Sequence, residues 1–329
     1  MTLNPSGYVV SVALLVALGA ASSPVSAQVR RLEELTRTDI QALDRSRTVV
    51  LLSGGILEQH GPHLPVYTDG YTTQWFTRRV AEAVVSRTQR PVVIYPQIPL
   101  GVGAPEEFAP RQRFSGSYMV RPETMRAVFM DVVSALGEDG FRWIFVIHDH
   151  GPLVHNRVLH ETADYFMDTY GGTMVVLSAL AGGPPPLAIG EEEQHEDGLR
   201  VHAGLWETSQ MLFLRPELVD SGFHSLVSFP VRNPDELQRR AASPTWLGYF
   251  GAPRLGRVDI GGRDLERESE GMVNVALRVL QGESARALPR YGYATPANSA
   301  FVALDRAIAE QAARWAEQQA RWMKAHEIR

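Results

Sequence analysis

The sequence predicts an α/β fold in which a mostly parallel central sheet lies between two layers of helices. Short β-branched and apolar runs alternate along the chain with segments whose apolar residues recur every three or four positions. Two of these runs lead into segments that combine His with Asp or Glu. Because ligands of parallel sheets bind beyond the carboxyl ends of the strands, this order also indicates a functional site at that edge.

Four runs have the composition of strands that are buried on both faces, namely residues 48–53, 91–95, 142–147 and 173–178. Between them we expect helices over residues 70–86, from Pro122 to Gly140, and over residues 156–170. Pro122 suits the first turn of a helix, where its missing N–H has no intrahelical partner to lose. We expect residues 181–198 to form a loop and residues 221–262 to be irregular, because they lack a clear period.

The C-terminal segment predicts one long helix with a single apolar face. The residues of this face are Phe301, Leu304, Ile308, Ala312, Trp315, Gln319 and Trp322. We expect the helix to pack on the body of the protein. Contact with a partner subunit is the alternative, because two tryptophans on one stripe make a large apolar patch. The predicted organisation is therefore a main domain over residues 28–285 and a helical extension over residues 286–329.

The first 27 residues are typical of a secretory signal peptide. Residues 8–21 are apolar and uncharged but too short for a membrane span, and Val25-Ser26-Ala27 offers a small-residue cleavage site before Gln28. This predicts a periplasmic or secreted protein without a stable membrane span after cleavage. The first ten residues lack Lys and Arg, so an uncleaved anchor or a buried N-terminal helix are the alternatives.

Composition excludes several kinds of chemistry. The chain has 329 residues, a formal net charge of −5 and no cysteine, which excludes disulfides, thiolate catalysis and Cys-ligated metals. The mild acidity offers no basic field for nucleic acid, so we expect no nucleic-acid partner. Lys324 is the only lysine, which argues against a Walker-type phosphate loop and against Schiff-base chemistry.

The loop after the first strand, GGILEQHGPHLPVYTD, brings together two carboxylates and imidazoles. Glu58 and His60 are two residues apart, so in an extended segment their side chains point the same way. Asp69 follows just before the next helix. Carboxylate oxygens and imidazole nitrogens suit Zn²⁺, Mn²⁺ or Fe²⁺. A polar loop whose Asp69 merely caps the helix is the alternative.

Two further segments carry the same residue types. The third strand ends in His148-Asp149-His150, which delivers imidazole and carboxylate to the same sheet edge. The segment VHAGLWETS contains His202 and Glu207 just before a helical stretch. Two interpretations of these residues remain open. His202 and Glu207 are a proton-transfer histidine and a metal carboxylate, or the segment simply begins a helix whose Glu complements the helix dipole.

Together the three segments resemble the creatininase family. The pattern Glu-x-His-Gly-x-His-Leu-Pro followed by Thr-Asp matches EQHGPHLPVYTD, and HAGLWETS and GFRWIFVIHDHG match two further family blocks. The resemblance covers roughly residues 40–280. It implies a three-layer α/β/α fold, hydrolysis of C–N bonds with two divalent metal ions per subunit (Zn, Mn or Fe), and a homo-oligomer, often a hexamer.

The resemblance also implies roles for individual residues. Metal ligands are Glu58, His60, Asp69 and His150, with Asp69 bridging two ions, Glu58 and His150 on one ion, and His60 on the other. Pro152 stands where creatininase proper has a further carboxylate. Other members use the Glu of the His-Ala-Gly block there, so we assign Glu207.

Further residues are expected to transfer protons, to support the metal ligands or to contact substrate. His202 matches the histidine that handles protons near the substrate, and His148 is the reserve for that role. His63 is expected to fix a ligand by hydrogen bonding. Ser117 and Trp206 are expected to contact substrate. The segment HDHGPLVHN departs from the usual Asn-Gly before the metal histidine, so substrate identity does not carry over.

The sequence thus predicts a dinuclear metal amidohydrolase that cleaves a non-peptide C–N bond of a small amide, such as a creatinine-like, lactam or N-formyl compound. Two divalent ions would lower the pKa of a shared water and polarise the amide carbonyl. A metallopeptidase that trims a short peptide is one alternative. A family member that binds metal or a small ligand without turnover is the other.

Overall fold

The computed structural model describes residues 28–104, 107, 114–180, 187–294 and 298–326; the predicted signal peptide lies outside them. The centre is a sheet of five strands, all parallel, in the order β1-β3-β2-β4-β5. The strands are β1 Val29–Arg31, β2 Val49–Gly54, β3 Val92–Ile94, β4 Trp143–His148 and β5 Thr173–Val176. The predicted α/β class is confirmed, and β1 is an edge strand that the sequence did not reveal.

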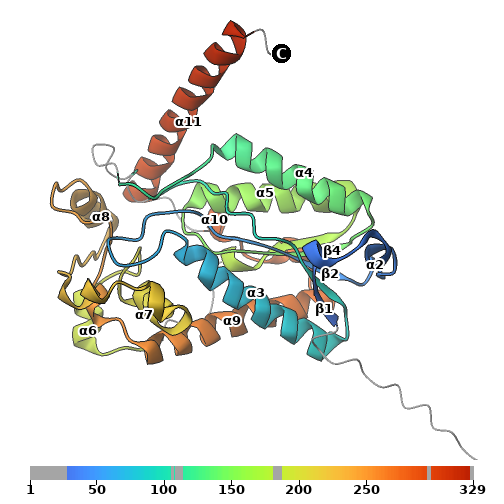
Figure 1. Ribbon diagram of the computed structural model, residues 1–329, viewed down its shortest axis with the longest axis horizontal. Coiled ribbons are helices and arrows are strands. Elements are labelled where there is room, and N and C mark those ends of the chain that lie inside the picture. Colours follow the sequence, from blue (N-terminus) through green and yellow to red (C-terminus); the bar gives the residue numbers. More distant parts are fainter. Residues whose placement is uncertain (1–27, 105–106, 108–113, 181–186, 295–297, 327–329) are drawn as a thin grey trace, which may run out of the picture.

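Helices cover both faces of the sheet, which makes three layers (Figure 1). One layer contains α3 (Thr68–Thr88) and α9 (Val258–Leu280), and the other contains α4 (Pro122–Glu138) and α5 (Leu153–Tyr170). Side chains of β2 alternate between them. Val50 and Leu52 pack with the α4–α5 layer, whereas Val49 and Leu51 pack with the α3–α9 layer. Burial on both faces explains why the strands are uniformly apolar.

The region after β5 is more helical than its sequence indicates. Short helices form at α6 (Glu191–Asp197) and α8 (Pro234–Ala241), within stretches expected to be a loop and irregular, and α9 begins at Val258. Local capping explains α8, because Asn233 accepts a hydrogen bond from the N–H of Glu236 at 2.9 Å. The remaining helices are α2 (Arg37–Gln41), α7 (Leu205–Leu214) and α10 (Tyr291–Ala294).

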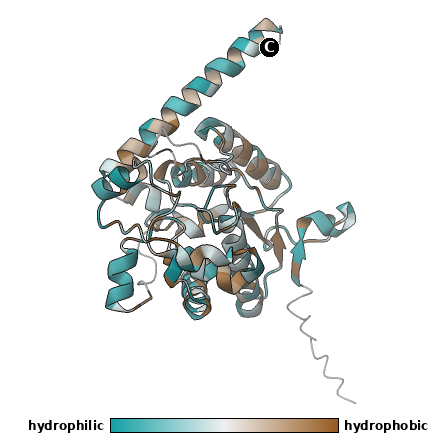
Figure 2. Ribbon diagram, turned by 60° about the vertical axis from the view of Figure 1, so that its left-hand side comes forward, coloured by the Kyte–Doolittle hydropathy of each residue, from teal (hydrophilic) through white to brown (hydrophobic). Residues whose placement is uncertain are grey.

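The last helix, α11 (Ser299–Ala325), has two different halves. Its buried residues, Ala300, Leu304, Ile308 and Ala312, all lie in the first half, and Leu304 and Ile308 belong to the main core. The second half projects away from the body (Figures 1 and 2). There Trp322 is 56% exposed. Among the described residues, no helix combines the length and apolarity needed to cross a membrane.

Candidate active site

The first part of the site comes from the loop between β2 and α3. Glu58 and His60 lie in this loop, and Asp69 lies in the first turn of α3. All three side chains are buried, with the residue of His60 completely so. The backbone N–H of Glu58 donates to Val66 O at 2.8 Å, so the loop folds back on itself and brings Asp69 beside Glu58 and His60.

Two other elements complete the cluster at the same sheet edge. His150 follows the end of β4 by two residues, and its Nδ1 lies 3.1 Å from Asp69 Oδ2 and 3.4 Å from Glu58 Oε2. Glu207 lies in the first turn of α7, and its Oε2 is 3.7 Å from His60 Nε2. His60 Nε2 is also 3.1 Å from Asp69 Oδ1. The structure therefore brings together all five predicted ligand residues.

The two oxygens of Asp69 divide these residues into two groups. Glu58, Asp69 and His150 form one group and His60, Asp69 and Glu207 the other, and within each group the ligand atoms lie within 4.8 Å of one another. Ligand atoms about 2.0–2.2 Å from one ion lie at most about 4.4 Å apart. The observed separations of 3.1–3.7 Å between contacting pairs fit that limit.

Hydrogen bonds to backbone carbonyls fix which nitrogen of each histidine faces the cluster. His60 donates from Nδ1 to Glu58 O at 2.9 Å, and His150 donates from Nε2 to Gly103 O at 2.8 Å. His202 donates from Nε2 to Gln59 O at 2.7 Å. In the neutral ring the opposite nitrogen therefore turns a lone pair towards carboxylate oxygens. A proton or a metal ion must lie between such atoms, so the donor set fits divalent metal ions.

The charges around His60 and His150 favour the positively charged form of both rings. Burial alone would lower the pKa of His60, but its hydrogen bond to Asp69 and the charges of Asp69, Glu207 and Glu58 raise this pKa to about 10. Burial likewise opposes charge on His150, yet Glu58 and Asp69 hold the pKa of His150 well above its ordinary value. Burial raises the pKa of Glu58 to about 7, against the opposing charge of His150.

His202 lies at the edge of the cluster. Its Nδ1 is 3.9 Å from Glu58 Oε2, and its ring centroid is 4.3 Å from that of His60. Burial and the neighbouring His60 hold the pKa of His202 well below its ordinary value. The ring is therefore neutral, and Nδ1 is its unprotonated nitrogen. Glu58, His60 and His202 also form a third group of close ligand atoms.

Two other predicted residues contact the cluster indirectly. His63 Nε2 is 2.9 Å from the hydroxyl of Thr208, the residue after Glu207, so it contacts no predicted ligand by this bond. Ser117 accepts a hydrogen bond from the N–H of Gln59 at 3.1 Å and so holds the loop of Glu58 and His60.

His148 and Trp206 lie further from the cluster. His148 is buried beside His155, with His148 Nδ1 3.2 Å from His155 Nε2. Burial and the nearby His150 lower the pKa of His148 to about 4. Trp206 is 5% exposed and lies below the guanidinium of Arg200.

The cluster opens into a cavity of about 570 Å³. Its lining includes Asp149, Arg200 and Glu268, which the sequence analysis did not single out as site residues. Burial, then the charges of Glu268 and Asp69, raise the pKa of Asp149 to about 7. Asp149 lies inside the HDHG segment and Arg200 lies two residues before His202, so both were near a recognised motif. Glu268 lies on α9, where no motif points to it.

Comparison with known proteins shows which sequences this chain resembles. The family model described as creatinine amidohydrolase matches residues 33–276. A creatinine amidohydrolase of Pseudomonas putida is 26% identical over 182 residues, which are 52% of this chain and 66% of that protein. The chain thus matches slightly less than two thirds of the length of this relative.

Solved structures agree at the level of the fold. A protein from Bacteroides fragilis assigned as a creatinine amidohydrolase has a TM-score of 0.55 at 21% identity, over 77% of this chain and 97% of that one. A manganese form of creatininase has a TM-score of 0.55 at 19% identity, over 76% and 98% of the two chains. A zinc–zinc form of a creatininase variant has a TM-score of 0.54 at 19% identity, over 76% and 97%.

Proposed function

The chain belongs to the creatininase family, and from that premise we propose that it is a metal-dependent amidohydrolase acting on a non-peptide C–N bond of a small cyclic or linear amide. One observation carries the proposal. Asp69 turns one oxygen towards His60 and the other towards His150, at 3.1 Å in each case, between two further carboxylates. Two buried carboxylates and the partly buried Glu207, gathered around imidazoles, are a costly arrangement that divalent cations would stabilise.

We assign two metal positions that share Asp69. Glu58 and His150 would hold one ion and His60 and Glu207 the other, as the two groups of ligand atoms divide. Divalent ions bound there would act as Lewis acids towards an amide carbonyl and lower the pKa of a water. The backbone carbonyls of Glu58 and Gly103 keep the rings of His60 and His150 in the tautomers that binding requires.

His202 is the residue that we assign to proton transfer. Its Nε2–H is held by Gln59 O, so a proton must be taken up and released at Nδ1, the nitrogen that faces Glu58. Taking a proton there and giving it to the leaving nitrogen is the general acid–base help that amide cleavage needs, typically about 10²–10⁴-fold. Its position beside the cluster favours His202 over His148, which is buried against His155.

The test combines metal analysis with hydrolysis of formamide, lactam, creatinine and dipeptide substrates. We expect about two divalent ions per chain, and metal-dependent release of amine or ring-opened product. Glu58→Gln should lower kcat/KM by more than about 100-fold, the upper end of what loss of an outer-shell partner costs. Release of amino acids from peptides alone would favour the peptidase. Bound metal without hydrolysis of any substrate would favour the binding protein.

We also propose that the protein is exported and cleaved after Ala27, which places it in the periplasm or outside the cell. The support is the apolar stretch at residues 8–21 followed by Val25-Ser26-Ala27. Mass spectrometry of the protein purified from its native host should find Gln28 as the first residue. Retention of Met1 would contradict the proposal.

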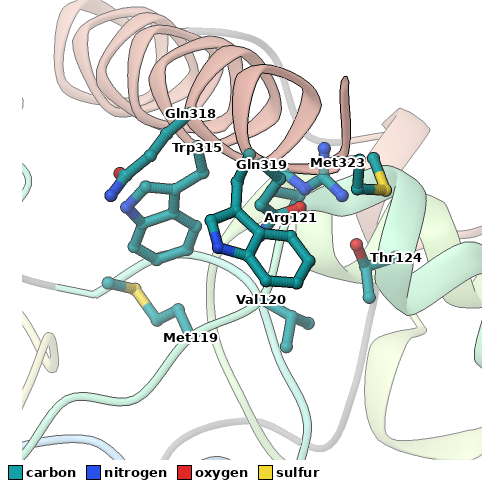
Figure 3. Close-up of a pocket in the computed structure, with 9 residues that line it drawn as sticks. Met119, Val120, Arg121, Thr124, Trp315, Gln318, Gln319 and Met323 are labelled. Atoms are coloured by element: carbon teal, nitrogen blue, oxygen red, sulfur yellow. The ribbon is translucent and has the colours of Figure 1, made fainter. Parts of the chain in front are cut away.

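Finally, we propose a homo-oligomer in which the outer half of α11 contacts a second copy. Figure 3 shows Trp315 of α11 over Met119 and Met323 beside Thr124, around a cavity of about 690 Å³ that Val120 and Trp322 also line. The projecting half of α11 has only about 12–15 residues, a length at which an isolated helix is marginally stable in water. Sedimentation should detect an oligomer that Trp322→Glu weakens and that Val302→Glu, an exposed position in the inner half of the helix, leaves intact. A monomeric wild type would contradict it.

A further inference from the structure

Two cavities of this protein share one wall. The cavity of the candidate site measures about 570 Å³, and a neighbouring cavity measures about 930 Å³. Six residues line both of them: Asp149, Ser178, Leu180, Leu199, Arg200 and Glu268. Because the linings share these residues, the two cavities lie side by side at Arg200 and Glu268.

The side chain of Arg200 is fixed at this junction. Its Nη1 lies 2.8 Å from Glu268 Oε1 and 3.0 Å from Oδ2 of the fully buried Asp264. The guanidinium also lies over the ring of Trp206, 5.3 Å from its centroid. Within the described part of the chain, the other two nitrogens of Arg200 donate to no residue. They are therefore available to an oxygen acceptor of a bound molecule.

The two cavities offer different groups to a bound molecule. The metal-ligand cluster lines part of the first with carboxylates and imidazoles. The second contains an apolar patch, Met272 and Val275 of α9 with Leu177 and Leu288, beside charged side chains such as Arg267, Glu270 and Arg278. A molecule that spans both would place a polar reacting end near Asp69 and an apolar part beyond Arg200.

We propose that the second cavity binds an apolar arm of the substrate, so that the substrate is an amide with an extended hydrocarbon or aromatic substituent. Arg200 lies where the polar end of the bound substrate would join its apolar arm. The inference rests on the proposed amidohydrolase function and narrows its substrate class. A compact ring such as creatinine would fill only the first cavity.

The experiment compares short and long amides on the full metal-loaded chain. Acetamide and hexanamide test an arm on the acyl side, and N-methylacetamide and N-hexylacetamide test an arm on the amine side. Each methylene that is fully buried favours binding by about fourfold. We expect the longer member of at least one pair to have a kcat/KM at least about tenfold higher. Calorimetric binding of the same amides to the metal-free chain gives a second readout that does not depend on turnover.

Tryptophan substitutions on α9 locate the effect. Val275→Trp and Asn274→Trp should fill the second cavity and reduce the preference for the long amide to about twofold or less. Asn274 is exposed, so its replacement should not disturb the core. Val258→Trp is the matched control, because Val258 lies on the same helix, is 52% exposed and lines neither cavity.

The possible results separate this inference from the proposed function. Equal kcat/KM and equal binding within both pairs would overturn the inference, and so would a preference that survives both cavity substitutions. A preference in binding without hydrolysis of any amide would support the second cavity as the arm site and overturn the amidohydrolase proposal instead.

Discussion

Two neighbouring regions of the molecule, the sheet edge with the candidate metal ligands and helix α9, contain buried acids. The negative charge of these acids is balanced in a different way in each region. On the sheet edge, Glu58, Asp69 and Glu207 have only histidines as ion-pair partners within the described residues. On α9, by contrast, acids are paired with arginines. Asp264 is completely buried and contacts Arg200 at 3.0 Å and Arg267 at 2.6 Å.

The difference indicates where an added cation is needed. Arginine stays protonated in proteins, so the α9 region carries its own balancing charge. The histidines of the sheet edge turn lone pairs towards the acids, and they balance them only when a proton or a metal ion is added. The negative charges of the α9 region are therefore balanced within the folded chain, whereas those of the sheet edge require an added cation.

The largest expected effect comes from the shared carboxylate. Asp69→Asn keeps the shape of the side chain but removes a charge that serves both ligand groups. We expect occupancy of both metal positions to fall and kcat/KM to drop by more than about 100-fold, beyond the cost of losing an outer-shell partner. Elemental analysis after dialysis and steady-state kinetics measure the two effects.

Asp149→Asn is the matched control for this substitution. Asp149 is a carboxylate of the same cavity, it accepts from Thr72 Oγ1 at 3.0 Å, and it belongs to neither ligand group. Its substitution should leave metal occupancy close to that of the wild type. Equal metal loss in both variants would remove the distinction between the sheet-edge acids and their neighbours.

The sequence predicted the sheet edge better than the α9 region, for a physical reason. Glu58, His60 and Asp69 lie within one loop, and His150 directly follows a strand whose apolar run is unmistakable. Parallel strands place such loops at one edge, so the chain order alone predicts the meeting of these residues. The convergence of Glu207 on His60 followed from the family resemblance.

The α9 region could not be predicted in the same way. Arg200, Asp264 and Glu268 meet through tertiary packing between a loop and a helix 64 residues further along the chain. Charged residues on a helix are usually solvated, so nothing in the sequence marks Asp264 as fully buried. The short helix α8 was missed because a local cap at Asn233, and not an apolar period, determines where it begins.

The next expected effect, on stability, tests the α9 region. Asp264→Ala removes the acceptor shared by Arg200, Arg267 and Gln210 and leaves buried donors without a partner. Breaking a buried ion pair in this way typically costs about 3–5 kcal/mol. Because Arg200 is itself 38% exposed, we expect a loss of free energy of unfolding at the lower end, about 3 kcal/mol, in denaturant titrations.

Glu266→Ala provides the comparison on the same helix. Its ion pair with Arg79 is exposed, at 43% and 41%, so its removal should cost less than about 1 kcal/mol. Metal occupancy should be unchanged in both variants, because neither residue belongs to a ligand group. Metal loss in Asp264→Ala would mean that the two regions are not independent.

The smallest expected effect concerns stability at acidic pH. It depends on a buried histidine outside α9, because α9 contains no histidine. His160 on α5 donates from Nε2 to Ala179 O at 3.0 Å, just after β5. Burial, together with the charge of Arg290, lowers the pKa of His160 from 6.5 to about 4. The unfolded chain therefore takes up a proton near pH 6.5, whereas the folded chain takes it up only near pH 4. The stability contributed by the neutral ring is complete above pH 6.5 and is lost progressively as the pH falls to about 4.

His160→Gln tests this assignment, because glutamine can still donate to Ala179 O but does not titrate. Its free energy of unfolding should fall less steeply than that of the wild type between pH 6.5 and 4, as measured by urea titration across that range. His195→Gln, an exposed position on α6, should follow the wild-type curve. If His160→Gln follows it as well, the acid sensitivity of the protein does not come from His160.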